Sequence, residues 1–419
     1  MCVSGCAQPG KTRDYLTLPP GPFRSVYLVP DSQAGFDRLE LIVQAGEMDN
    51  TGPEGLAHYT EHLAWISQIG TGRLSSRHSN AWTTDRATGY FVSGPGSDLP
   101  SNMRRLLGVH LPFDLPEKFM LEERDIVLRE FDQRMLEWPY ASVYRDIGRI
   151  LYGDGPLSRT TIGTAKSIST FTVEAAREFH QRTHAHSNSV LIASGSLKPE
   201  ALQSELQQRK ANELSKPVPI PAPPVAPIRD EQMVELPRLS AEELVYAKIV
   251  DVTLYSSGAR LQVTVDMLGQ LLDSALEGGI AGPLRYDAFI ARSFDLGLSL
   301  NAGTHLEMWF SARPDSGVSL DTLQQAFELA LQSSSEAGIP EQSFNKVKQR
   351  YLADVTNTDD KPEFTRRVLR QQIMNRLPPL GYSDILNAAQ TVTLGDVEQL
   401  YRALIGDGRL VIRQLYPRL

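Results

Sequence analysis

Two kinds of hydrophobic pattern alternate along the chain. Short runs such as 26–29 and 39–43 are dominated by aliphatic and aromatic residues, which is typical of β-strands. The longer segments between such runs place apolar residues three or four positions apart, which is the spacing of an amphipathic helix. This alternation predicts an α+β fold in which sheets are packed by helices.

A proline-rich stretch divides this pattern into two. Residues 216–227 contain six prolines, a density that leaves no room for a helix or a central strand. We therefore predict an N-terminal domain over residues 1–215, an extended linker over 216–230 and a C-terminal domain over 231–419. Each domain is large enough to bury a core of its own.

The two predicted domains also end alike. A threonine-led helix pattern over 170–179 precedes a β-type run at 189–194, and one over 391–400 precedes a β-type run at 409–413. The two helix patterns lie 391 − 170 = 221 residues apart. A helix followed by a strand is common, but its position at the end of both halves favours two α+β units of similar topology.

Composition and charge exclude several classes of protein. Of the 419 residues, 41% are hydrophobic and 22% are charged, as in globular rather than disordered chains. The 42 basic and 50 acidic residues give a net charge of −8, so we expect no nucleic-acid partner. No run of 18 apolar residues is present, so we expect no membrane span.

The only two cysteines, Cys2 and Cys6, stand at the start of the chain. Their position rules out a disulfide framework and a cysteine-ligated metal in the core. Residues 3–7 resemble the end of a bacterial lipoprotein signal, but the apolar segment that should precede it is missing. The sequence as written predicts a cytoplasmic protein. The alternative is a periplasmic or lipid-anchored protein, if a signal precedes Cys6.

One motif carries the candidate chemistry. Residues 55–66 have helical apolar spacing, and within them His58 and His62 stand four apart, so both can bind one metal ion from the same face. Glu61 lies at the edge of that face, where a carboxylate can take a proton from water beside the metal. The order His-x-x-Glu-His is the inverted form of the zincin motif. The alternative is a helix with two surface histidines and an unrelated glutamate.

A third protein ligand is expected from the helix pattern over 116–137. On it Glu123 and Glu130 are seven residues apart and share a face with Ile126 and Val127. Carboxylates beside apolar residues are costly without a cation or partner. Taken alone, this acidic helix is typical of a solvated face, but the histidine motif favours a metal-binding role. The other histidines are predicted to be structural: His78, His110, His180, His184, His186 and His305.

These residues together closely resemble the motif of the pitrilysin/insulysin (M16) family of zinc metallopeptidases, which includes the mitochondrial processing peptidases. His58-Tyr-Thr-Glu61-His62 is followed by Glu130 after 130 − 62 = 68 residues. Weaker matches cover residues 45–52, 80–83, 156–163 and 188–191. The resemblance implies a fold of two homologous α/β sandwich units, each a mixed and mainly antiparallel sheet packed by helices, as in the LuxS/M16-like metalloenzymes.

The resemblance also implies roles for individual residues. His58, His62 and Glu130 would bind zinc, Glu61 would be the general base, and Glu123 would support the site from behind the ligands. Asn80, Ala81 and Trp82 would belong to an edge strand that pairs with an extended peptide, with Trp82 packed rather than selective. The implied activity is zinc-dependent endoproteolysis of peptides or unfolded segments inside a closed chamber.

The chain departs from the family in two respects. The interval between the second and third ligands is short, which implies trimmed loops around 73–79 or 93–100. By the resemblance, active members also carry an Arg/Tyr pair in the second half that contacts the substrate near the scissile bond. Arg292 can supply the arginine, but residues 294–300 contain no tyrosine, and the adjacent Arg285 and Tyr286 are expected to point apart.

These departures bear on assembly. The family encloses peptides between four α+β units, and this chain has two, so the resemblance implies a dimer. We favour the zinc-bearing subunit of a heterodimer over a homodimer, because the Arg/Tyr pair is incomplete. The alternatives are a non-catalytic structural or binding subunit, and a dedicated maturase of one small precursor peptide.

Overall fold

The structure is a computed structural model that describes residues 14–69, 78–113, 115–138, 140–207, 223–224, 226–255, 258–301 and 303–418. Cys2, Cys6, most of the predicted linker and most of the 73–79 loop lie outside these residues. The domain boundaries therefore stay a prediction, although the first strand of the second half already begins at Ile228, inside the stretch expected to be linker.

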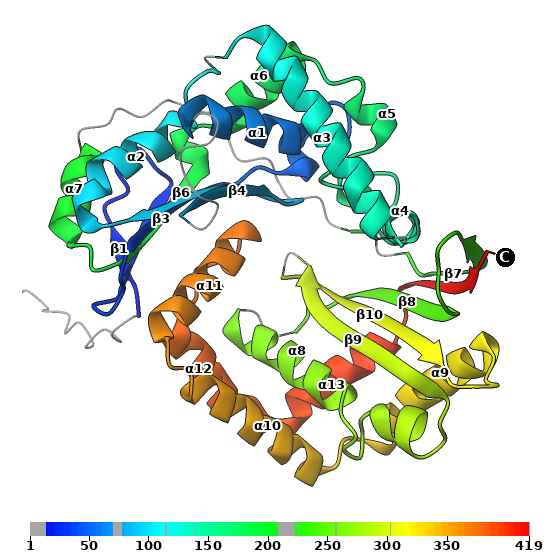
Figure 1. Ribbon diagram of the computed structural model, residues 1–419. Coiled ribbons are helices and arrows are strands. Elements are labelled where there is room, and N and C mark those ends of the chain that lie inside the picture. The colour runs from blue at the N-terminus through cyan, green and yellow to red at the C-terminus, as the bar shows by residue number, and fades with distance from the viewer. Residues whose placement is uncertain are drawn as a thin grey trace, which may run out of the picture.

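The first half is built on a six-stranded mixed sheet (Figure 1). Its strands are β1 (Leu16–Leu18), β2 (Ser25–Pro30), β3 (Asp37–Val43), β4 (Ser79–Thr83), β5 (Thr88–Gly94) and β6 (Ser189–Gly195), in the order β1-β2-β6-β3-β5-β4. β2 and β6 are parallel, and all other neighbours are antiparallel. β4 is thus an edge strand of this sheet, as the sequence predicts.

Helices cover one face of this sheet. They are α1 (Leu56–Ile69), α2 (Leu99–Gly108), α3 (Glu117–Glu137), α5 (Ala165–Ile168), α6 (Val173–Thr183) and α7 (Pro199–Gln207). The helices bury residues such as Leu63, Met103 and Phe179 in one core with Leu41 and Leu191 of the sheet. This core fixes α1, which carries the histidine motif, against the strands.

The second half repeats this plan. Its strands are β7 (Ile228–Leu236), β8 (Glu243–Asp251), β9 (Ala291–Asn301), β10 (His305–Pro314) and β11 (Arg409–Pro417), in the order β7-β11-β8-β10-β9. Its helices are α8 (Ala259–Leu272), α9 (Leu320–Ala337), α10 (Glu341–Thr356), α11 (Lys361–Met374), α12 (Tyr382–Thr391) and α13 (Leu394–Ile405). Only the pair β7 and β11 is parallel.

The two sheets have the same topology. The order β2-β6-β3-β5-β4 of the first corresponds strand by strand to β7-β11-β8-β10-β9 of the second, with the one parallel pair in the same place. In each half, the last helix before the final strand begins at a threonine N-cap, Thr172 for α6 and Thr393 for α13. The predicted fold of two similar units, each a mixed sheet packed by helices, is therefore confirmed.

Each half lends one helix to the other. α11 of the second half lies against the first sheet, where Leu369 and Ile373 pack on Ile42 and Ile192 (Figure 1). Its counterpart in the first half, α4 (Ala141–Tyr152), packs Ile147 on the second sheet. Each half keeps a main core of its own, and two smaller hydrophobic clusters contain residues of both halves.

Buried charges cross the same boundary. Glu40 of β3 is 0% exposed and lies 2.9 Å from both Arg366 and Arg370 of α11. Arg413 of β11 is also 0% exposed, and it pairs with Asp146 of α4 at 2.8 Å. Because a buried charge without a partner is strongly destabilising, these pairs fix how the exchanged helices sit on the sheets.

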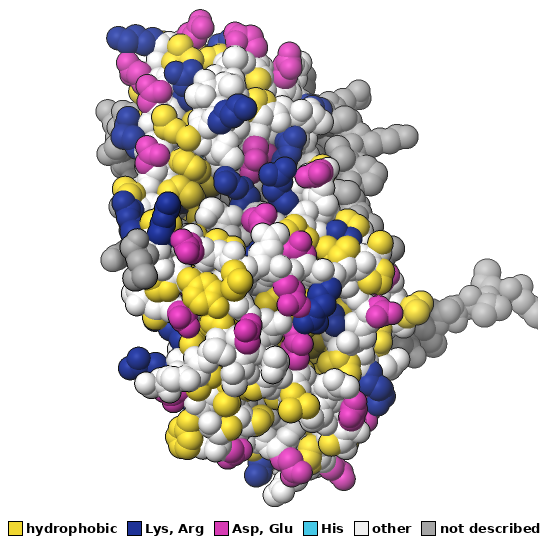
Figure 2. Space-filling view, turned by 90° about the vertical axis from the view of Figure 1, so that its right-hand side faces the viewer, with side chains coloured by type: hydrophobic (Ala, Val, Ile, Leu, Met, Phe, Trp, Pro, Cys, Tyr) yellow, Lys and Arg dark blue, Asp and Glu magenta, His cyan; other side chains and the backbone are white. Residues whose placement is uncertain are grey.

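One face of the molecule is mixed in charge. Figure 2 shows basic and acidic side chains interspersed over one face, with small apolar areas between them. Within the described ranges, no helix combines the length and the apolar character that a bilayer crossing requires.

Candidate metal centre

The local sequence around α1 explains why the helix presents the histidine motif as it does. Leu56, Tyr59 and Leu63 are buried against the core, so the opposite side of α1 carries the polar motif residues. Gly55, just before the helix, has φ +91°, and a Cβ there would lie 2.6 Å from the carbonyl oxygen of Ile162. Only glycine allows this close approach, which sets the start of α1.

Four motif side chains converge at the open side of α1. Nε2 of His58 and Nε2 of His62 each lie 3.7 Å from Oε2 of Glu130, which comes from α3. Oε2 of Glu61 lies 3.9 Å from Nε2 of His58. In the part of the chain that the structure describes, His58, Glu61 and His62 form the one group of three such side chains whose ligand atoms are close enough to hold a metal ion.

A carboxylate behind the cluster orients one histidine. Nδ1 of His62 lies 2.8 Å from Oε1 of Glu123, which is buried on α3. When Nδ1 carries the proton and donates it to Glu123, the lone pair of Nε2 faces Glu130 and His58. Metal-binding histidines typically have such a carboxylate partner.

Burial and neighbouring charges set the charge states. Burial raises the pKa of Glu61 to about 7, although His62 and the Thr83 hydroxyl favour its ionised form. Burial and the neighbouring His62 lower the pKa of His58 well below its ordinary value. Burial opposes a charge on His62 as well, but its contact with Glu123 and the nearby Glu61 and Glu130 outweigh burial and raise its pKa.

This donor set suits a divalent metal such as zinc. Two neutral imidazole nitrogens and one carboxylate oxygen make up a three-ligand set of the kind found in catalytic zinc sites, which leave a fourth position open. Nδ1 of His58 is buried and has no hydrogen-bond partner among the described residues. The residues present therefore fit a zinc ion.

The cluster lies in a cavity of about 520 Å³ bordered by the edge strand β4. Asn80, Ala81 and Trp82 line this cavity together with the motif residues. The Trp82 ring packs against Gly89 of β5, where a Cβ would come within 2.0 Å, and Arg370 of α11 lies 4.6 Å from its centre. Trp82 is thus held in place from two sides, as expected for a packed residue.

The arginine expected to approach the cluster from the second half does not line this cavity. Arg292 lies exposed on β9 and is absent from the cavity wall. The expectation that Arg285 and Tyr286 point apart is wrong, because the guanidinium carbon of Arg285 lies 5.7 Å from the centre of the Tyr286 ring. The chain forms a π-helical turn at Gly282–Tyr286, so the periodicity of an ordinary helix or strand does not apply.

Two further residues contact the cluster, and neither is among the site residues predicted from the sequence. The Thr83 hydroxyl donates a hydrogen bond to Oε2 of Glu61 over 3.3 Å. Arg134, one turn after Glu130 on α3, donates to Oε1 of Glu130. The spacing of four between Arg134 and Glu130 was the available signal for the second contact. No pattern in the sequence indicates the first.

Four of the remaining histidines form a buried cluster of their own. Nε2 of His184 bonds the Tyr90 hydroxyl at 2.8 Å, and Nε2 of His180 donates to the carbonyl of Val109 at 2.7 Å. The rings of His110 and His186 lie 4.2 Å apart, centre to centre. His110, His180 and His184 have hydrogen-bond partners in the core, and the His186 ring packs on Phe23 and His110. Their burial agrees with the structural role expected for them.

Relatives identified by sequence are named as zinc proteases or as subunits of processing peptidases. The β subunit of the mitochondrial processing peptidase of Saccharomyces cerevisiae is 25% identical over 224 residues, covering 49% of this chain and 46% of that protein. The uncharacterized zinc protease YmfH of Bacillus subtilis is 20% identical over 427 residues, covering 97% of this chain and 94% of that protein. The match thus spans just under half of the yeast subunit and nearly all of the bacterial protein.

Solved structures share the fold over the whole described chain. The first half of the periplasmic protease PqqL from Escherichia coli superposes with a TM-score of 0.80 and 17% identity, covering 97% of this chain and 92% of that one. A second PqqL structure contains a longer chain, and there the match covers 99% of this chain but only 48% of the PqqL chain. An inactive domain of an M16 peptidase from Pseudomonas fluorescens has a TM-score of 0.78 and 15% identity, covering 97% and 98%.

No protein-family model matches the chain. The relatives and the fold nevertheless agree with each other and with the motif that stands on α1. The chain is similar to the zinc metallopeptidases of the pitrilysin/insulysin (M16) family, and it resembles the two-domain, processing-peptidase-like members of that family.

Proposed function

We propose that this chain is a zinc-dependent metalloendopeptidase that cleaves peptides or unfolded segments. The observation that carries the proposal is the convergence of His58, His62 and Glu130, with Glu61 beside them, in a cavity bordered by an edge strand. His58, His62 and Glu130 are the proposed zinc ligands. Asn80, Ala81 and Trp82 are the proposed peptide contacts.

The residues of the cluster divide the chemistry between them. A bound zinc ion supplies a Lewis acid that polarises the scissile carbonyl and makes water more acidic. Glu61 takes the proton of the attacking water and passes it to the nitrogen of the leaving amine. Thr83 donates to Oε2 of Glu61 and orients the carboxylate, while Glu123 holds the His62 ring through Nδ1.

The peptide is expected to bind as an added strand. β4 pairs only with β5 in the described sheet, so the N–H and C=O groups of its other side are open to a substrate. Such pairing recognises an extended backbone and depends little on sequence. It therefore supports a substrate that is a peptide or an unfolded segment.

We further infer that the working enzyme contains a second two-unit chain. The longer PqqL chain is about twice the length of this one, since this chain covers 48% of it. Arg292 does not line the metal-centre cavity, so the described residues of this chain place no arginine of the second half there. A partner chain of the same family would close the cavity, and we favour a different chain over a second copy.

The rival function is a structural or binding subunit without catalysis. The likeness to an inactive M16 domain shows that this fold also exists without activity. Against this rival, the chain keeps both histidines and both glutamates, and they converge. A dedicated maturase of one precursor peptide would use the same chemistry and would differ only in the range of peptides that it cleaves.

The test is digestion of a mixed peptide library by the purified chain, read by mass spectrometry, with Glu61→Gln as the matched control. Cleavage that disappears in the control would support a peptidase, and cleavage of many peptides would exclude a single-substrate maturase. Cleavage that persists in Glu61→Gln would contradict the proposed mechanism. A chain that binds zinc and cleaves nothing, alone or with a copurified partner chain, would favour the structural subunit.

A further inference from the structure

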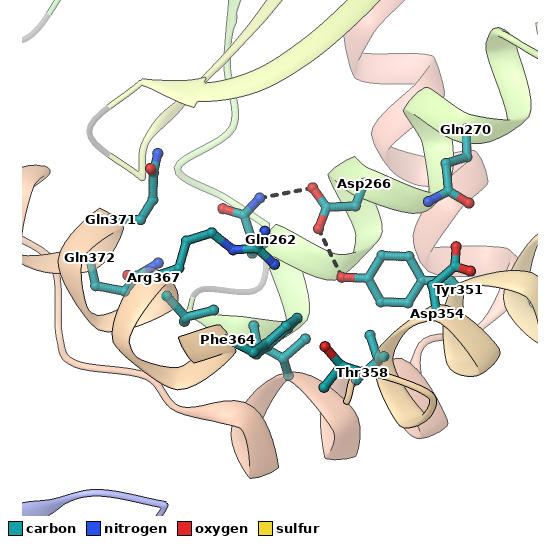
Figure 3. Close-up of a pocket in the computed structure, with 13 residues that line it drawn as sticks. Gln262, Asp266, Gln270, Tyr351, Asp354, Thr358, Phe364, Arg367, Gln371 and Gln372 are labelled. Carbon is teal, nitrogen blue, oxygen red and sulfur yellow. Dashed lines mark hydrogen bonds between the residues drawn. The ribbon is translucent and has the colours of Figure 1, made fainter. Parts of the chain in front are cut away.

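A second cavity lies in the C-terminal half, where α8, α10, α11 and α12 meet (Figure 3). Its volume is about 390 Å³, and it shares no lining residue with the metal-centre cavity. By the common topology, α8 and α10 stand where α1 and α3 stand in the first half. The second half thus keeps a cavity beside the same pair of helices, but lines it with different side chains.

One wall of this cavity presents acceptors. Asp266 of α8 accepts hydrogen bonds from the Tyr351 hydroxyl and from Nε2 of Gln262, each over 2.9 Å (Figure 3). Both donors are neutral, and among the described residues no Lys or Arg nitrogen forms an ion pair with Asp266. Burial raises the pKa of Asp266, which shows the cost of this unpaired charge.

A second acceptor stands one turn further along α8. Oε1 of Gln270 is buried and has no hydrogen-bond partner in the described part of the chain. A buried acceptor left unpaired costs about 1–3 kcal/mol, so its neighbourhood favours a ligand that brings N–H groups. A primary ammonium carries three such donors, enough for both Asp266 and Gln270.

The other wall comes from α11 and α12, and it combines an apolar surface with two glutamines of α11 and a cation at its edge. Phe364, Val368 and Ile385 supply the apolar surface. Arg367 is exposed beside them, with its guanidinium carbon 5.2 Å from the centre of the Phe364 ring, and no carboxylate of the described residues forms an ion pair with it. The cavity therefore offers an anionic floor, an apolar side and a cationic rim.

We propose that this cavity binds a free α-amino acid with an apolar side chain. The ammonium group bonds to Asp266 and Gln270, the side chain packs on Phe364 and Ile385, and the carboxylate pairs with Arg367 at the rim. The cavity volume lies in the range of small-molecule sites, about 300–1,000 Å³. This proposal does not depend on the proposed peptidase function, because the affinity for an amino acid can be measured without any cleavage.

The test is calorimetric titration of the purified chain with L-leucine and with two blocked forms of it. L-Leucine is expected to bind. N-acetyl-L-leucine lacks the ammonium and L-leucinamide lacks the carboxylate, so each is expected to bind about tenfold more weakly or worse. Because these comparisons use the unaltered chain, no folding defect can mimic the result.

Variants locate the site. Asp266→Asn keeps the shape and removes the charge, and Arg367→Gln removes the cation, so each is expected to weaken L-leucine binding about tenfold or more. Asp132→Asn, on an exposed position of α3 in the other half, is the matched control and is expected to bind as the unaltered chain does. Absence of L-leucine binding at millimolar concentration would overturn the proposal. Undiminished binding by L-leucinamide, or by Asp266→Asn, would overturn it too.

Discussion

At the scale of single residues, the site depends on contacts made behind the motif. The sequence alone identifies His58, Glu61 and His62, because their spacing on a helix is specific. It indicates Glu130 only in combination with the histidine motif, because the acidic helix taken alone is typical of a solvated face. The Thr83 contact to Glu61 could not be predicted, since it joins residues 22 apart through the geometry of the β4 edge.

The first prediction concerns that contact. Thr83→Val removes a hydrogen bond that favours the ionised form of Glu61, so the pKa of Glu61 should rise further. A base with a higher pKa is protonated at a higher pH, so the acid limb of the pH profile of kcat/KM should move upward. Thr83→Ser keeps the hydroxyl and should leave the limb in place. An acid limb that does not move in Thr83→Val would show that the hydroxyl has no influence on Glu61.

The second prediction concerns the carboxylate behind His62. Glu123→Gln keeps the shape but weakens the orientation of the ring, so zinc affinity should fall about 10–100-fold. Competition with a chromogenic chelator measures the change. Glu122→Gln, at the adjacent and largely exposed position, is the control and should bind zinc normally. Equal affinity of both variants would assign Glu123 no part in the metal site.

At the scale of elements, the exchange of α4 and α11 joins the halves. The sequence predicts helices with apolar stripes, but a stripe tells only that a face is buried, not which sheet buries it. Leu369 packs on strands whose sequence positions are more than 150 residues away. Long-range pairing of this kind has no local signal, so the sequence could not predict that α4 and α11 each pack on the sheet of the other half.

The third prediction tests that packing. Leu369→Ala leaves a cavity in a site that is 0% exposed, so the free energy of unfolding should fall by about 2–5 kcal/mol. Leu329→Ala removes the same atoms from an exposed position on α9 and should change it by less than about 0.5 kcal/mol. Chemical denaturation of both variants makes the comparison. Similar losses in the two would mean that α11 is not held by this contact.

At the scale of the whole molecule, stability should depend on pH through the buried histidine cluster. Burial lowers the pKa of His110 to about 3, and lowers those of His180, His184 and His186. The unfolded chain therefore binds protons that the folded chain does not, below the ordinary histidine pKa of about 6.5. This stability is present above that pH and is lost as the pH falls toward 3.

The fourth prediction isolates one of these groups. Burial raises the pKa of Glu47 to about 8, so this group changes the free energy of unfolding with pH in the opposite direction to the histidines. The contribution of one histidine is therefore measured as the difference between the unaltered chain and a variant that lacks it. Between pH 6.5 and 4.5, the unaltered chain should lose about 1.4 kcal/mol per pH unit more than His110→Gln. Urea unfolding at several pH values gives both slopes. Parallel slopes would contradict a neutral, buried His110.

The two-unit plan was the part of the fold that the sequence predicted best. The N-caps Thr172 and Thr393, each followed by a β-type run, indicated equivalent ends of the two halves. The two sheets do have corresponding strand orders. Contacts between the two halves, such as that of Arg370 with the Trp82 ring, could not be predicted from the sequence. The residues that line the cavity between α8 and α10 could not be predicted either, because no sequence motif marks them.

The most direct test of the proposed metal chemistry is a zinc titration of the metal-free chain, with zinc uptake and cleavage of a fluorogenic peptide followed in the same samples. We predict that one zinc ion binds per chain and that cleavage rises in proportion to zinc uptake. Glu61→Gln should take up the same zinc without cleavage, and Glu130→Gln should take up little. Cleavage without zinc, or full zinc uptake by Glu130→Gln, would contradict the assignment of His58, His62 and Glu130 as the metal centre.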